Sequence, residues 1–161
     1  MLKYAQHENF EKALELREEI KMVEKLKQKV VAEVPKNGEI DVFAYRTNNI
    51  AGAISLVVVR GGKIIGVKNV TTIDASLTES EILSNFIRQY YENSKVPEVI
   101  LTSHVLEDAN QLAEMLKTTK KPTITKAERG YKKNLLKMAM FNAKDHLEKS
   151  SSIEKAHYDK T

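Results

Sequence analysis

The sequence predicts an α/β (α+β) fold, in which an N-terminal helix is followed by a mixed five-stranded sheet. Three observations predict it. Residues 40–70 hold three strand-like runs joined by short turns, which is typical of antiparallel strands. Residues 78–148 alternate short strand-like runs with helical stripes, which is typical of parallel strands joined by crossover helices. Ahead of both, residues 10–23 carry apolar side chains at helical spacing.

Composition limits the classes of protein that fit. A chain of 161 residues suits one α/β domain with an appendage. It has no cysteine, which excludes disulfides, thiolate zinc sites and a cysteine nucleophile. No apolar run has the length of a membrane span and no signal-peptide pattern follows Met1, so we expect a cytoplasmic protein. The net charge of +4 permits contact with nucleic acid without arguing for it.

The N-terminal run carries an apolar stripe. Its members recur three and four residues apart, on one face of a helix: Phe10, Ala13, Leu16, Ile20 and Val23. Asn9 can cap the first turn and Glu11 suits the helix dipole, so we expect a helix from Asn9 or Phe10 towards Lys29. Residues 2–6 hold about one turn, too short to be stable alone. Such a helix needs a covering partner, either another segment or a second protein.

This run resembles the UVR motif, a short antiparallel helical hairpin of the UvrB and UvrC subunits of the bacterial nucleotide-excision nuclease and of a few adaptor proteins. The resemblance is carried by Met1, Ala5, Phe10-Glu11, Ala13, Arg17 and Ile20, although Glu8 and Leu14 depart from the pattern. The match covers the second helix of the motif, and most of the first would precede Met1. A homodimer of the chain is therefore a further expectation.

The UVR resemblance implies that residues 1–30 dock UvrB. Phe10 and Ile20 would be buried anchors, and Ala13 would lie between them. Glu11 and Arg17 would make charged contacts at the edge. The simpler interpretation is that the stripe packs on the α/β domain of its own chain, and periodicity alone does not decide between the two.

The strands follow a hinge at residues 31–39, where Pro35 disfavours helix and residues 36–39 are typical of a turn. Three antiparallel strands are predicted: Ile40–Tyr45, Ala51–Arg60 and Lys63–Val70. Residues 47–49 form the first turn, and Gly61-Gly62 is a tight hairpin signal.

The second half alternates helices and short strands. Thr78 and Glu81 form a capping box for a helix ending near Asn93. We then expect a strand at Glu98–Thr102, a helix with its stripe at residues 109–116, a strand at Thr123–Thr125 and a helix at Tyr131–Glu148. Residues 150–161 are polar and are predicted to be a linker or frayed tail.

This element order resembles the ribonuclease H fold, and several segments resemble UvrC. They are Asp41-Val42, Arg60–Gly66, Phe86–Tyr91, Pro97–Leu101 and Arg129–Lys133. The resemblance implies an RNase H-like domain at residues 40–149 within a central fragment of UvrC. Such a fragment would act in nucleotide excision repair and scaffold the dual-incision nuclease domains of its parent protein. A UVR-containing adaptor outside DNA repair is an alternative.

A nuclease of this fold needs carboxylates that converge on divalent metal ions. Asp41 could supply one, and Glu79 or Glu81 another, but Thr102 and Ser103 stand where the fourth strand should supply a third. We therefore expect a non-catalytic domain with no metal, although the nuclease domains of the parent would use one such as Mg²⁺. The alternative is an active metal-dependent nuclease, and the simplest interpretation of Asp41 is a strand-edge or capping residue.

Two further groups of residues bear on function. A basic run could contact DNA phosphates or form a solvated face: Lys117, Lys120, Lys121, Lys126, Arg129, Lys132, Lys133 and Lys137. The four histidines have no partners at metal-ligand or triad spacing. His104, beside Ser103, is the one that merits attention, and a polar loop position is its simplest interpretation.

Overall fold

The computed structural model describes the backbone of residues 2–48, 50–72 and 76–158, and the side chains of residues 10–48, 50–72 and 76–149. Met1 of the UVR pattern and Asn49 of the predicted turn lie outside it. The elements are α1 (Leu2–Glu33), β1 (Glu39–Thr47), β2 (Gly52–Arg60), β3 (Lys63–Thr72), α2 (Glu79–Tyr90), β4 (Val99–Thr102), α3 (Ala109–Leu116), β5 (Thr123–Lys126) and α4 (Gly130–Tyr158).

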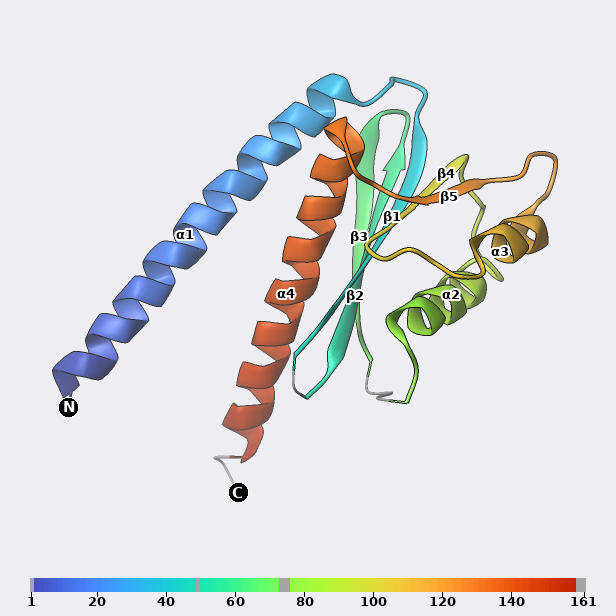
Figure 1. Cartoon of the computed structure of the whole chain (residues 1–161). Coiled ribbons are helices and arrows are strands. Elements are labelled where there is room, and N and C mark those ends of the chain that lie inside the picture. Colours follow the sequence, from blue (N-terminus) through green and yellow to red (C-terminus); the bar gives the residue numbers. More distant parts are fainter. Residues whose placement is uncertain (1, 49, 73–75, 159–161) are drawn as a thin grey trace.

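The predicted mixed sheet is confirmed. Its strand order is β3-β2-β1-β4-β5, in which the pairs β3–β2 and β2–β1 are antiparallel and the pairs β1–β4 and β4–β5 are parallel. Helices α1 and α4 lie on one side of the sheet, and α2 and α3 lie on the other (Figure 1). The parallel pairs need crossover connections, which α2 and α3 supply.

The core has two layers because side chains alternate along the strands. On one face, Val42 and Val57 pack with Leu135 of α4. On the other face, Phe43 packs with Leu83 of α2, and its ring meets Phe86 edge-on with ring centroids 5.9 Å apart. Both faces of β1 are therefore sealed from water between Ile40 and Tyr45.

The hairpin glycines hold the connection between α1 and β1. Gly61 and Gly62 have φ of 60° and 73°, which suits the tight β2–β3 turn. A Cβ on Gly62 would lie 2.8 Å from the carbonyl oxygen of Pro35, and the Gly62 N–H donates to the Gly38 carbonyl at 3.4 Å. Residues 34–38 are thus packed against the hairpin at the base of α1.

Helix α1 is longer than predicted at both ends. The prediction that it begins at Asn9 or Phe10 is wrong, because its backbone is helical from Leu2. Residues 2–6 need no nucleus of their own, since they extend a helix already formed by the residues that follow. At the other end α1 continues to Glu33, so residues 31–33 of the predicted hinge are helical, and buried Val30 and Val34 fix this turn to the sheet.

Helix α4 also exceeds its prediction. The backbone is helical from Gly130 to Tyr158, so the prediction of a linker or frayed tail is wrong for residues 150–158. No glycine or proline interrupts residues 131–158, and each added residue gains a backbone hydrogen bond at little cost.

Replacing Leu135 by Ala should lower the free energy of unfolding by about 2–5 kcal/mol, because this fully buried side chain joins α4 to the sheet. Urea unfolding followed by circular dichroism measures the change. Lys137→Ala, on the exposed face of the same helix, should change stability by less than about 0.5 kcal/mol. Equal effects of the two variants would contradict this assignment of the core.

Candidate partner-docking helix and basic cleft

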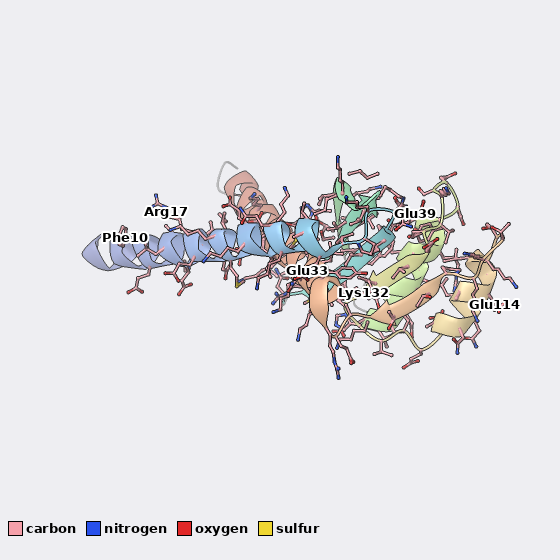
Figure 2. The ribbon with its side chains drawn as sticks, turned by 90° about the horizontal axis from the view of Figure 1, so that it is seen from above. Phe10, Arg17, Glu33, Glu39, Glu114 and Lys132 are labelled. Carbon is pink, nitrogen blue, oxygen red and sulfur yellow. The ribbon has the colours of Figure 1, made fainter. Side chains whose placement is uncertain are left out.

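The N-terminal half of α1 projects beyond the sheet (Figures 1 and 2), and several apolar side chains from Phe10 onward are exposed. Phe10 is 63% exposed and Ile20 is 41% exposed, and Ala13 and Arg17 are exposed as well. At about 100° per residue these four lie on one flank of the helix, whereas Glu11 is turned about 100° from Phe10. Four of the five predicted partner-binding residues therefore share one exposed flank, and Glu11 lies off it.

The C-terminal half of α1 is attached to the domain. Val23 and Leu26 are partly buried against the core, and Val30 is only 1% exposed. Glu19 pairs with Lys144 of α4 at 3.1 Å. Part of the stripe is thus covered by its own domain, and the part from Phe10 to Ile20 is left open.

Asp41, the first predicted carboxylate, is buried in a polar network. It is fully inaccessible on β1, and Arg60 of β2 donates to both of its carboxylate oxygens, at 2.8 and 3.4 Å. The Tyr91 hydroxyl, at the C-terminal end of α2, donates to the same carboxylate. A buried carboxylate needs such partners, since unpaired it would be strongly destabilising. The interpretation of Asp41 as a strand-edge or capping residue is therefore wrong, since it lies inside the sheet.

The network changes the pKa of its two hydrogen-bond donors, Tyr91 and Arg60. Burial raises the pKa of Tyr91 far above its ordinary value, and the charge and hydrogen bond of Asp41 raise it further. Burial lowers the pKa of Arg60, but the hydrogen bond and charge of Asp41 outweigh this, so the pKa of Arg60 is raised overall. Tyr91 stays neutral and Arg60 stays charged, as the buried carboxylate requires.

The other two predicted carboxylates lie apart from Asp41. Glu79, at the start of α2, contacts His104 Nε2 at 2.9 Å. Glu81 lies in the same first turn, where its backbone N–H donates to the Thr78 hydroxyl at 3.2 Å and confirms Thr78 as the helix cap. Within the described residues, no three histidine, aspartate or glutamate side chains gather where they could hold a metal ion.

Ser103 directly follows β4, at the position where a nuclease of this fold would need its third carboxylate. Its hydroxyl accepts the Tyr45 N–H at 2.9 Å and lies 2.8 Å from His104 Nδ1. The Ser103 hydroxyl and Glu79 thus contact the two ring nitrogens of His104 from opposite sides of the imidazole. These polar groups satisfy one another, and the arrangement orders the end of the strand.

The predicted basic run divides between two places. Lys120 and Lys121 precede β5, where Lys121 pairs with Glu114 at 3.3 Å. Lys126 ends this strand and Lys133 lies in α4, and both line a cleft with other cations. Arg129, just before α4, is exposed. Lys132, in the first turn of α4, is half-buried (Figure 2). The run is therefore not one continuous face.

The cleft has a volume of about 820 Å³ and lies between α1 and α4, at the carboxyl ends of β1, β4 and β5. Ligands of open α/β sheets bind at such ends. Five cations line it: Arg46, Lys126, Lys133, Lys137 and Lys144. Its two carboxylates are Glu19, which pairs with Lys144, and Glu128. In the described part of the chain the other four cations have no carboxylate within salt-bridge distance.

Comparison with known families adds to this geometry. Residues 39–150 match the family model described as the UvrC Ribonuclease H-like domain. This range contains the whole sheet and most of α4, which is well over half of the chain. The chain belongs to the UvrC family.

Several UvrC relatives are similar over most of this chain. UvrABC system protein C of Desulforapulum autotrophicum is 31% identical over 91% of this chain, and that of Clostridioides difficile is 33% identical over 94% of it. The protein of the same name from Symbiobacterium thermophilum is 35% identical over 88%. The chain spans about a quarter of the length of these curated relatives, between 23% and 26%.

Two cleft cations of this UvrC-family chain were missed by sequence reasoning. Arg46 lies on β1 and Lys144 on α4, well away from the basic run along the chain. The spacing of Lys133, Lys137 and Lys144, which places them on one face of a helix, was the signal available in the sequence.

None of the described helices combines the length and apolar character that a membrane crossing requires.

The Tyr91 network makes stability depend on pH in the alkaline range. The folded state keeps the Tyr91 proton at pH values where the unfolded chain has lost it, so above about pH 10 this group lowers the free energy of unfolding by about 1.4 kcal/mol per pH unit. Urea unfolding across this range should show a shallower decline for Tyr91→Phe than for the parent chain. Parallel declines would contradict the network.

Divalent metal ions should not stabilise the chain, because its described carboxylates do not converge. Thermal unfolding with and without millimolar Mg²⁺ or Mn²⁺ measures this. We expect that neither metal ion changes the unfolding midpoint of the parent chain or that of the Asp41→Asn variant. A midpoint raised by metal in the parent and not in Asp41→Asn would support the metal-dependent nuclease instead.

Proposed function

We propose that this chain is a docking and scaffold module of nucleotide excision repair, and that it binds UvrB through α1. One observation carries the proposal. The flank of α1 that holds Phe10, Ala13, Arg17 and Ile20 is exposed, although the same helix is buried in the domain at Val30. Membership of the UvrC family supports the choice of partner.

The flank suits a helical partner. Phe10, Ala13 and Ile20 follow the three- and four-residue spacing with which one helix packs against another. Phe10 would enter a pocket of the partner as the central anchor, and Arg17 would pair with a carboxylate at the rim. Because the base of α1 is already fixed, binding orders few additional residues, which lowers its entropic cost.

In this proposal the chain has a scaffold role and not a nuclease role. Asp41 is hydrogen-bonded to Arg60 and Tyr91, and Glu79 contacts His104. Because these carboxylates already have protein partners, they support a domain that positions the incision domains of its parent. Incision and its metal ions would belong to those other domains. DNA contact by residues of the basic run stays a prediction, as does self-association of the chain.

Phe10→Ala should weaken binding to UvrB by about 2 kcal/mol or more, roughly 30-fold, since it removes the proposed anchor. Isothermal titration calorimetry measures the affinity. Ile65→Ala is the matched control, because Ile65 of β3 is 64% exposed and lies away from α1. It should leave the affinity unchanged.

An unchanged affinity of Phe10→Ala for UvrB would overturn the proposal. If a pull-down recovers a Clp-type ATPase and not UvrB, the chain is an adaptor outside repair. If sedimentation shows a dimer that Phe10→Ala dissociates, the flank pairs two copies of this chain.

A further inference from the structure

The basic cleft is built as a groove along a helix. Lys133, Leu136, Lys137, Met140, Phe141 and Lys144 line it from α4. Their spacing places them on one face over about three turns, roughly 16 Å at 1.5 Å per residue. Met22 and Glu19 face the groove from α1. The groove therefore has the length of a short helix and is bounded by helices on two sides.

The floor of the groove is apolar. Phe141 and Met140 are half-buried there, and Met22 opposite them is 54% exposed. Phe141 belongs to neither main core cluster, so it is not needed to fill the interior. Methionine side chains adapt their shape to a bound apolar surface. An open apolar floor of this kind favours a ligand that brings apolar side chains of its own.

The rim of the groove is cationic. Arg46, Lys126, Lys133 and Lys137 are all exposed, and in the described residues none has a carboxylate partner. Their long side chains can reach outward past the floor, so that charge surrounds the apolar surface. A ligand that matches both parts has an apolar strip flanked by negative charges.

From this complementarity we propose that the cleft docks an acidic amphipathic helix of a partner protein. Leucine-like side chains three and four residues apart would cover Met22, Met140 and Phe141, and flanking glutamates or aspartates would pair with the rim. Duplex DNA offers the charge without an apolar strip, and would leave the floor in water. The proposal goes beyond UvrB docking, because Met22 lies about 160° around α1 from Ile20.

The experiment measures fluorescence anisotropy of a labelled peptide of about 14 residues, with leucines three and four residues apart and glutamates elsewhere. The full chain should bind it, and added salt should weaken the binding. A peptide with lysine in place of every glutamate, and one with the same composition in alternating order, should not bind. Failure to bind the acidic helical peptide would overturn the proposal.

The variants test rim and floor separately. Lys133→Glu with Lys137→Glu should weaken peptide binding by at least about tenfold. Lys120→Glu with Lys121→Glu, which changes net charge equally outside the cleft, should weaken it by less than about twofold. Phe141→Ala should weaken it by at least about fivefold and keep the thermal unfolding midpoint of the parent. Equal losses in the two charge-reversal variants would overturn the proposal.

Nucleic acid is the competing outcome. If a labelled oligonucleotide, single- or double-stranded, binds more tightly than the peptide and loses affinity in the Lys133→Glu, Lys137→Glu variant, the cleft is a nucleic-acid site and the proposal fails. Phe10→Ala separates peptide binding in the cleft from UvrB docking by α1, because this variant should retain peptide binding whether or not it binds UvrB.

Discussion

Strand β1 is hydrogen-bonded along both edges and covered on both faces, and the placement of the other elements follows from this constraint. Its parallel partner β4 requires a crossover, and its two apolar faces require helices on each side of the sheet. Asp41 is the fully buried acid of this strand, so its charge must be compensated in place. Arg60 supplies the opposite charge and the Tyr91 hydroxyl supplies a further hydrogen bond, so this carboxylate is part of the core.

Helix α1 joins this sealed domain to its surroundings. Val30 and Val34 are held by the core, and Gly62 allows the loop below them to pack closely against the hairpin. The same helix then runs beyond the sheet with Phe10 in solvent. Rigidity at the base and exposure at the tip are the properties expected of a docking element. Its two sides differ, since one carries the exposed flank and the other closes the cationic groove.

Local patterns predicted most of the fold. Strand alternation, the glycine pair at residues 61 and 62 and the Thr78 cap located five strands and the helices between them within a few residues, because each depends on neighbours along the chain. Helix ends were less well predicted. The start of α1 and the end of α4 depend on how far an established helix propagates, and no capping signal marks those ends.

By itself, the sequence determined the order of the elements, the apolar stripe of α1 and the lack of a third carboxylate at Ser103. Only the tertiary structure decided that Asp41 meets Arg60 and Tyr91, and that Arg46 and Lys144 share one cleft. The physical reason is one of range. The residue spacing of helices and strands reflects hydrogen bonds and side-chain directions within a few residues, so it can be read from the sequence. The residues that surround a charged side chain come from segments far apart along the chain, so they depend on tertiary packing.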